Sequence, residues 1–290
     1  MAIIRQNTCH GRGGHLVTVA NSDAHGDPWS TVAGHVAYDV RPGSAGWPCL
    51  RLGSPVSSTS SSVTRSTGTR DALSVAVYVW VPTGAAVTLS VGGTSAGHPS
   101  AVWSTSGGLT LGGATVSSAV ASATRDRLVR VEVSASAGTA TYRITYVNPL
   151  VTAPDYEASV AYTGTLTTVR ALAAAGSRAW VDTLRVGEGE WLGSGIIGPA
   201  STPGYTASGP WVVLAQEDLM AAGYELPQWG ADGFYGAEMS TAVQALQTGH
   251  GLVVDGIMGP SARAALDQEL NAARYPTAVG PVGWGVPLAA

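Results

Sequence analysis

The chain has 290 residues, of which 45% are hydrophobic and only 12% are charged, and its formal net charge at pH 7 is -4. This composition excludes a largely disordered chain, and the length allows one large domain or a large and a small one. The negative charge gives no electrostatic reason to expect a nucleic-acid partner.

Two cysteines, Cys9 and Cys49, permit at most one internal disulfide, and the sequence leaves open whether they pair or remain two thiols. Residues 1–30 contain no basic segment followed by a long apolar core, so we expect no secretory signal peptide. No stretch approaches the roughly 18 uninterrupted apolar residues of a membrane span. We therefore expect a soluble chain without a membrane partner, and one that ordinary secretion does not export.

From about residue 15 to residue 191 the sequence is typical of β-strands separated by Gly, Ser, Thr and Pro clusters. The clearest strand spans 73–81, where a hydrophobic residue recurs at every second position. Similar runs predict strands at 86–91, 128–134, 139–147, 158–162, 166–172 and 178–186. Their regular spacing and the near absence of helical periodicity favour an antiparallel sandwich or jelly roll.

Two polar stretches interrupt this pattern. Residues 54–70 are rich in Ser and Thr, and they suit either a low-complexity surface segment or a polar edge strand. Residues 192–210 have the Gly, Pro, Ser and Thr content of a linker. We therefore place a domain boundary in this second stretch.

Beyond residue 210 the hydrophobic period changes from two residues to about 3.6. Three apolar stripes predict three short helices, and Gly223 is a stop signal for the first. The stripes are Val212, Ala215, Leu219 and Ala222; Met239, Ala242, Val243 and Leu246; and Ala262, Ala265, Leu266 and Leu270. The predicted fold class is thus multidomain, an all-β jelly-roll sandwich followed by a small all-α three-helix domain.

The pattern D-G-x-x-G occurs at 232–236 and again at 255–259, in each case just before a predicted helix. Asp-Gly suits a tight turn, because glycine tolerates positive φ and the Asp side chain can bond to the backbone that follows it. The last glycine, Gly236 or Gly259, lets the chain turn into the helix, and Pro260 suits an early helical position. The repeat predicts two copies of one loop-and-helix unit that share a small core.

Residues 211–270 resemble the peptidoglycan-binding domain found at the ends of bacterial and phage cell-wall proteins. An ordered series of positions through both turns carries this resemblance: Gln216, Leu219, Gly223, Tyr224, Asp232, Gly233, Phe234, Tyr235, Gly236, Ala242, Val243, Leu246, Gln247, Gly251, Leu252, Val254, Asp255, Gly256, Ile257, Gly259, Pro260, Ala265 and Leu266. The chain departs from the family at Met239 and Ala262, where Thr is usual, and at Leu246, where Phe is usual. The resemblance implies a three-helix module that binds peptidoglycan.

Residues 30–193 are similar to the concanavalin-like and laminin-G-like jelly rolls of phage tail and decoration proteins. The strand spacing and the closing run VDTLRVGEGEWLG carry this second resemblance. The expected organisation is an N-terminal arm at 1–30, the sandwich at 31–193, a linker at 194–210, the peptidoglycan-binding-like domain at 211–272 and a Pro/Gly-rich tail at 273–290. We expect the arm and the tail to be ordered by docking on a partner.

An uncharged glycan with short peptides is best held by aromatic faces and by amide or backbone donors. We therefore predict a peptidoglycan-binding groove near the first turn, lined by Trp229, Tyr235 and Gln247 and shaped by Asp232. Trp229 and Tyr235 each adjoin a glycine and are expected at the surface, whereas Phe234 is expected in the core.

No catalytic residue is predicted in the sandwich. Concanavalin-like glucanases carry an acidic triplet, E-x-D-x-x-E, along one strand, and the sequence lacks it. Glu188 and Glu190 lie between glycines and are interpreted as solvated loop residues.

The main alternative is a cell-wall hydrolase with a zinc site near His35 and Asp39, which have an H-x-x-x-D spacing. His10, His15, His25 and Asp27 are close in sequence. The later His of such peptidases has no counterpart, because only His98 and His250 follow His35. We therefore expect neither a metal nor a cofactor.

These observations favour a non-enzymatic surface protein of a phage virion, in the tail or the capsid, that reaches the exterior by host lysis. Its expected partners are peptidoglycan or cell-wall glycan, other virion proteins and further copies of itself in a homo-oligomer. Two alternatives stay open: a virion-associated or lysin-type hydrolase, and a helical module that only packs and binds no wall.

Overall fold

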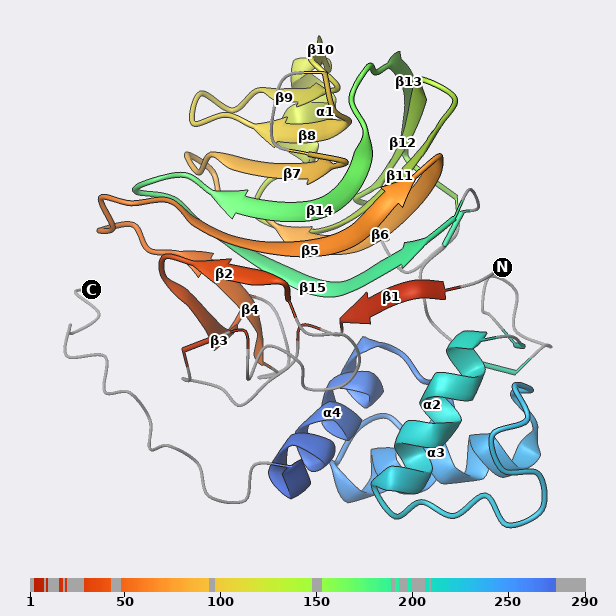
Figure 1. The fold of residues 1–290 in the computed structure, drawn as a ribbon. Helices are drawn as coiled ribbons and strands as arrows, with labels where there is room; N and C mark the ends of the chain where they lie inside the picture. Colours follow the sequence, from red (N-terminus) through yellow and green to blue (C-terminus); the bar gives the residue numbers. More distant parts are fainter. Residues whose placement is uncertain are drawn as a thin grey trace.

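In the computed structural model the chain folds into a two-sheet β-sandwich followed by a small helical domain, as predicted (Figure 1). The structure describes residues 3–7, 9, 16–17, 19, 29–42, 48–93, 97–147, 153–188, 191–192, 198–199, 207–208 and 210–274. The expected tail at 273–290 lies outside these residues, apart from its first two.

The first sheet has eight strands, and all its strand pairs are antiparallel. The order is β13-β12-β11-β6-β15-β4-β3, and β1 pairs with β15 off this path. The strands are β1 (Ile3–Asn7), β3 (Val36–Val40), β4 (Pro48–Gly53), β6 (Ala72–Trp80), β11 (Leu128–Ser136), β12 (Thr139–Thr145), β13 (Tyr156–Ala161) and β15 (Arg178–Gly187).

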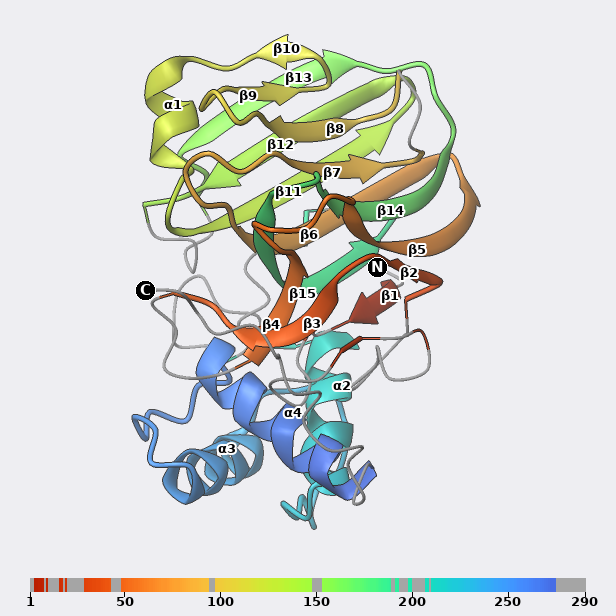
Figure 2. The same ribbon diagram turned by 90° about the vertical axis from the view of Figure 1, so that its left-hand side faces the viewer.

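The second sheet has seven strands in the order β10-β9-β8-β7-β14-β5-β2. They are β2 (Thr31–Ala33), β5 (Ser61–Arg70), β7 (Val87–Val91), β8 (Ser100–Trp103), β9 (Leu109–Leu111), β10 (Ala114–Thr115) and β14 (Leu166–Ala173). Figure 2 shows the two sheets as the two layers of the sandwich. The seven strands predicted from hydrophobic alternation are all present, with ends shifted by a few residues.

The sandwich core consists largely of β-branched and small side chains from the two inner faces. Val75, Val77 and Val79 of β6 are buried there, as their period-two spacing predicts. Two larger side chains satisfy their polar atoms inside the core. Trp103 Nε1 donates to Thr124 Oγ1 at 2.9 Å, and the Tyr142 hydroxyl accepts a hydrogen bond from a backbone N–H.

The structure corrects two expectations about the sandwich. β5 covers 61–70 and is not an edge strand, because it pairs with β14 on one side and with β2 on the other. Although its sequence is polar, part of the strand lies in the core, since Val63 and Ser61 are fully buried. The short helix α1 (Ser118–Ala123) was not expected, because six residues rich in Ala and Ser give little helical periodicity.

The described residues of the N-terminal segment contribute to the sandwich. β1 pairs with β15 along 184–187, next to the stretch 178–181 that pairs with β4. β1 therefore supplies hydrogen-bond partners that β4 does not reach. Cys9, Val17 and Trp29 belong to the sandwich core.

Cys9 and Cys49 are not joined by a disulfide, and both are buried. Burial in an apolar environment raises the pKa of each thiol well above its ordinary value. The sequence left open whether the two cysteines pair, and in the structure they are unlinked.

Three helices form the second domain: α2 (Pro210–Ala221), α3 (Ala237–Gly249) and α4 (Pro260–Arg274). The three predicted stripes meet in one core, with Ala222 at its margin, and Gly223 follows α2 with a positive φ of 94°. The helices lie together at the end of the sandwich near β1, β3 and β4 (Figures 1 and 2). None of the described helices combines the length and apolar character needed to cross a membrane.

An ion cluster joins α2 to α4 inside this domain. Arg263 contacts the carboxylates of Asp218 and Asp267, the latter at 2.8 Å. Asp267 is completely buried and Asp218 nearly so. Burial would lower the pKa of Arg263, but the two carboxylates more than reverse this and raise it.

Candidate functional site

The first D-G-x-x-G turn is held by the side chain of Gln216 from α2. Gln216 Nε2 donates to Asp232 Oδ1 at 2.8 Å and to the Phe234 carbonyl at 3.1 Å, and Gln216 Oε1 accepts the Gly233 N–H at 2.8 Å. Asp232 Oδ1 also accepts the Phe234 N–H at 2.9 Å, as the turn chemistry predicts. Gly233 has a φ of 79°, which explains the glycine.

The second turn repeats this arrangement with Gln247 from α3. Gln247 Nε2 donates to Asp255 Oδ1 at 2.7 Å and to the Ile257 carbonyl at 3.0 Å, and its Oε1 accepts the Gly256 N–H at 2.9 Å. Gly256 has a φ of 66°, and a Cβ there would lie 2.5 Å from Ser240 Oγ. The sequence repeat is therefore two copies of a glutamine-clasped turn.

The two turns are joined by Tyr235. Its hydroxyl donates to the Gly256 carbonyl at 2.6 Å, and burial raises the pKa of the phenol. Tyr235 is only 6% exposed. The first turn is also fixed from its other side, because the Tyr235 N–H donates to the Ala207 carbonyl at 2.8 Å.

The exposures of Phe234 and Tyr235 are the reverse of what we expected. Phe234 is 66% exposed, whereas Tyr235 belongs to the helical core. The repeat does not decide between the two residues, because Phe234 aligns with Ile257 and Tyr235 with Met258, and both of these are apolar.

Gln247 is not at the surface either. It is 3% exposed, and its side chain forms four hydrogen bonds with the second turn. The signal that sequence reasoning missed is its partner Gln216, which occupies the same place relative to the first turn. A glutamine that recurs with each turn indicates a structural role.

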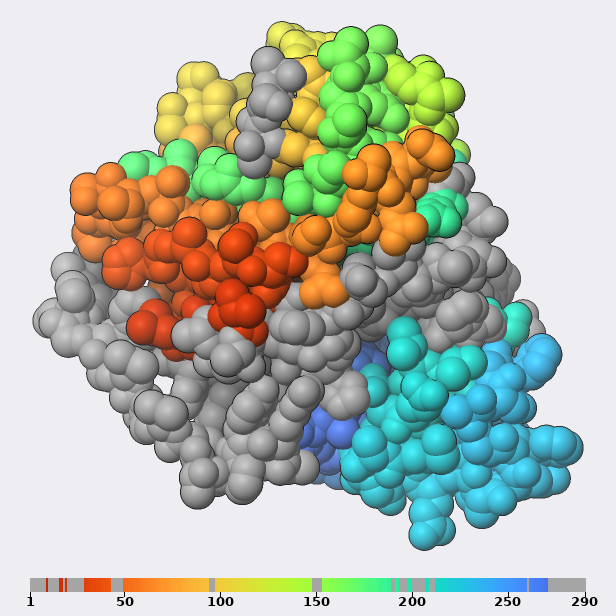
Figure 3. Space-filling model, in the orientation of Figure 1, coloured from red at the N-terminus to blue at the C-terminus, as the bar shows by residue number. Residues whose placement is uncertain are grey.

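Trp229 is at the surface, as expected, and is 64% exposed. The carboxylate of Glu238, in the first turn of α3, accepts the backbone N–H groups of Gln228 and Trp229 at 2.7 and 3.1 Å. Trp229 and Phe234 thus come from one connection between α2 and α3, and this connection is fixed by hydrogen bonds at both residues. It runs over the outside of the helical lobe (Figures 1 and 3).

We use the name loop surface for the exposed residues of the two turns and of the segments before them. It consists of the exposed apolar side chains Trp229, Phe234, Val253 and Val254 and the exposed carboxylates Asp232 and Asp255. Val253 and Val254 are 80% and 51% exposed and precede the second turn directly. Hydrogen bonds from the Phe234 N–H and from Gln216 hold the pKa of Asp232 below its ordinary value.

A second polar cluster lies where the ends of the helices meet. Glu269 of α4 accepts hydrogen bonds from the Tyr224 hydroxyl at 2.9 Å and lies 2.7 Å from His250 Nε2. Burial and the Glu269 carboxylate raise the pKa of Tyr224 to about 12. This cluster ties the C-terminal ends of α2 and α3 to α4.

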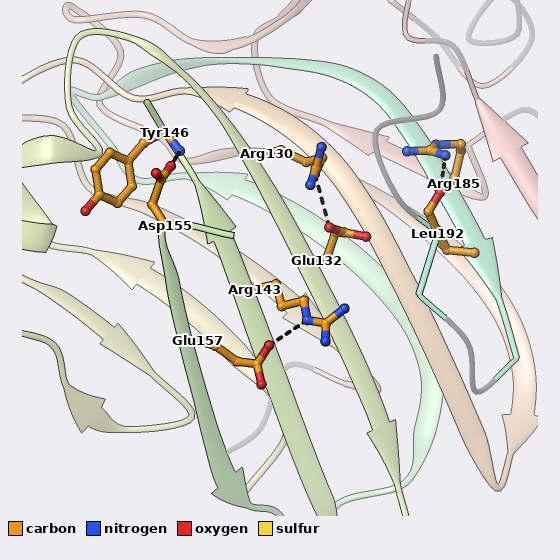
Figure 4. A network of polar contacts seen from close by, with 8 residues as sticks. All are labelled: Arg130, Glu132, Arg143, Tyr146, Asp155, Glu157, Arg185 and Leu192. Carbon is orange, nitrogen blue, oxygen red and sulfur yellow. Dashed lines mark hydrogen bonds and ion pairs between the residues drawn. The ribbon is translucent and has the colours of Figure 1, made fainter. Parts of the chain in front are cut away.

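Several carboxylates of the sandwich are held by arginines or by backbone N–H groups. Figure 4 shows Glu132 with Arg130 and Glu157 with Arg143, at 3.1 and 2.6 Å. In the same view Asp155 accepts the Tyr146 N–H at 2.6 Å. Glu188 pairs with Arg70 at 2.8 Å, whereas Glu190 lies outside the described residues. These contacts make the carboxylates structural partners of neighbouring strands and loops.

His35 and Asp39 are not brought together into a metal site. Asp39 pairs with Arg51 at 3.0 Å, and His35 is an exposed residue of the turn before β3. Within the described part of the chain no three His, Cys, Asp or Glu side chains are grouped so that they could hold a metal ion. His10, His15, His25 and Asp27 lie outside that part.

Two turns of the same construction, each held by a glutamine, connect the three helices of this domain. Residues 208–266 match the family "Putative peptidoglycan binding domain". The match covers α2, α3, both turns and the first part of α4.

Two curated amidases share this module with the chain. It is 52% identical over 60 residues to "N-acetylmuramoyl-L-alanine amidase CwlL" of Bacillus licheniformis, and 51% identical over 59 residues to "Probable N-acetylmuramoyl-L-alanine amidase" of the same organism. The alignments cover 21% and 20% of this chain and 17% of each relative. The similarity is thus confined to the module.

Solved structures resemble the chain only distantly. One is the lumenal domain of VIP36 in its Ca2+/Man2-bound form, with 11% identity and a TM-score of 0.40. The alignment spans 63% of this chain and 87% of the VIP36 domain. Another is a peptidoglycan-binding protein from Clostridioides difficile, with 20% identity and a TM-score of 0.23. The alignment spans 50% of this chain and 62% of that protein. Likeness at this level says nothing about function.

Proposed function

We propose that this chain is a non-enzymatic surface protein of a bacteriophage virion, and that its helical module attaches the particle to the peptidoglycan of the host. The observation that carries the proposal is the loop surface within the matched module. Trp229 and Phe234 are about two-thirds exposed there, although the module has a core in which aromatic side chains could be buried. Exposed aromatic residues on a fixed backbone are typical of binding sites.

The condition of the sandwich carboxylates supports attachment without cleavage. Hydrolysis of a glycan needs two carboxyl groups of different pKa on either side of the bond. Glu132, Glu157 and Glu188 each pair with an arginine, and Asp155 accepts backbone N–H groups. These carboxylates are therefore engaged in holding the fold together.

The rival function is a zinc-dependent wall hydrolase with His35 and Asp39 at its centre. The two amidases that share the module are a reason to consider it. Against it, Asp39 is engaged by Arg51, and the described residues offer no third ligand nearby. Zinc in hydrolases has three protein ligands, so we favour the attachment function.

The virion role is supported by the resemblance of residues 30–193 to the jelly rolls of tail and decoration proteins. In this proposal the sandwich attaches to other virion proteins or to copies of itself. Its edge strand β13 offers backbone groups for such contacts. The module then projects toward the wall.

The two functions separate in one experiment with isolated sacculi. The full chain is incubated with sacculi, the mixture is centrifuged, and turbidity is followed in parallel. We expect the chain to pellet with the wall and the turbidity to remain constant. Clearing that a chelator abolishes would establish the zinc hydrolase instead.

The virion role needs its own measurement. Antibodies against the full chain should label the surface of intact phage particles that encode it in electron micrographs. Purified particles that lack the chain altogether would contradict this part of the proposal.

A further inference from the structure

We propose that the loop surface binds the uncharged glycan strand of peptidoglycan and not its anionic stem peptides. This inference rests on the proposed wall binding and adds the part of the wall that is recognised. The charges of the module, its exposed apolar side chains and its repeated turns all favour a neutral ligand.

The module carries almost no positive charge. Between residues 208 and 266 the only Lys or Arg in the sequence is Arg263, whereas the acidic residues are Glu217, Asp218, Glu225, Asp232, Glu238 and Asp255. Arg263 is engaged by Asp218 and Asp267 between α2 and α4, and its side chain is 12% exposed. It therefore offers no cation to a ligand.

An anionic stem peptide fits such a surface poorly. Asp232 and Asp255 stand on the two turns, and both are exposed. A ligand carboxylate close to either would be repelled, because like charges at short range repel even in water. Recognition of carboxylates generally uses arginine or lysine, and the loop surface has neither.

The N-acetylated sugar rings of the glycan have the complementary chemistry. They are uncharged, and their C–H faces can pack on the rings of Trp229 and Phe234, which are 64% and 66% exposed. Val253 and Val254 extend the apolar area beside the second turn. The Tyr235 hydroxyl on Gly256 keeps the two turns next to each other.

The carboxylates can then act as hydrogen-bond acceptors. Asp232 and Asp255 each use Oδ1 to hold their own turn, through the clasping glutamine and a backbone N–H. Each carboxylate also has a second oxygen, Oδ2, which in these exposed residues can accept a hydrogen bond from a hydroxyl or amide group of a sugar. Because the turns are built alike, the repeat provides two similar acceptors for successive parts of one strand.

The test is competition in the sacculus pelleting assay with the full chain. The competitors are a chitin oligosaccharide, which is a neutral chain of N-acetylated sugars without peptide, and a free stem pentapeptide. We expect the oligosaccharide to release the chain from the pellet and the pentapeptide to have no effect. Binding should also be insensitive to salt, because the ligand is uncharged.

Two variants locate the binding. Trp229→Ala and Phe234→Ala should each weaken oligosaccharide binding by about ten-fold, which corresponds to about 1.4 kcal/mol. Val56→Ala, which changes an 83% exposed residue of the sandwich, is the matched control and should bind normally. Both test residues are exposed, so the thermal unfolding of the variants should match that of the parent.

The outcomes separate the two levels of the proposal. Release by the pentapeptide, or pelleting that neither competitor reduces, would overturn the glycan assignment while wall binding stands. A chain that never pellets would overturn wall binding and the glycan assignment together.

Discussion

At the scale of single residues, Tyr235 connects the two turns through one buried hydrogen bond. Replacing it by Phe leaves the Gly256 carbonyl without its partner, and we expect a loss of about 1 kcal/mol in module stability. The measurement is amide hydrogen exchange in α3 and α4, which reports this domain separately from the sandwich. Tyr156→Phe in β13, a half-buried tyrosine for which no hydroxyl hydrogen bond is recorded, should leave exchange unchanged.

Asp232 predicts how the module responds to acid. Its pKa lies below the ordinary value of 3.8, mainly because the Phe234 N–H and Gln216 bond to the carboxylate. The stabilisation is therefore complete above that value and is lost as the pH falls toward the lower, folded-state pKa. The helical circular dichroism of Asp232→Asn should depend less on pH between about 5 and about 3 than that of the parent. An identical acid profile for the two chains would contradict this.

The residue scale is also where sequence reasoning failed. The turn chemistry of Asp232 and Asp255 could be predicted, because it depends on neighbours in the chain. The positions of Phe234, Tyr235 and Gln247 could not be read from local sequence, because core packing decides which of two adjacent aromatics points inward.

At the scale of elements, each clasping glutamine couples a helix to a turn. Gln216→Ala and Gln247→Ala each leave buried backbone and side-chain groups without partners, and should destabilise the module by about 1–3 kcal/mol. Gln244→Ala is the matched control, since Gln244 lies in the same helix as Gln247 and is exposed. Equal stability of Gln247→Ala and Gln244→Ala would show that the clasp is unimportant.

The ion cluster between α2 and α4 should matter more. Arg263→Met leaves Asp218 and Asp267 buried without a cation, and we expect a loss of about 3–5 kcal/mol. Arg70→Met breaks the exposed pair with Glu188 and should cost less than about 1 kcal/mol. Thermal unfolding of the two variants provides the comparison.

The elements themselves were largely predictable. Strands with strict alternation, such as β6 and β11, and the three amphipathic helices have their periodicity written in the sequence. β5 was harder to place, because Ser and Thr hide a strand whose neighbours in the sheet come from distant parts of the chain. β1 belongs to the sheet for a similar reason, since β15 lies far from it in sequence.

At the scale of the whole molecule, a β-sandwich and a wall-binding type of module are joined in one chain. The segment between them starts with ordered contacts, because Trp191 stacks on Arg143 at 3.8 Å and the Leu192 carbonyl accepts from Arg185 Nη1 at 2.7 Å. Its far end, Ala207 and Ser208, is attached to the first turn. The module is thus tied to the sandwich through a connection that is fixed near both ends.

The account depends on the exposed aromatic pair holding the wall. The most direct measurement is the binding isotherm of the full chain and of the double variant Trp229→Ala/Phe234→Ala on purified sacculi. We predict saturable binding by the parent and a dissociation constant at least about ten-fold higher for the double variant, with unchanged unfolding. Equal affinity of the two folded proteins would contradict the central claim.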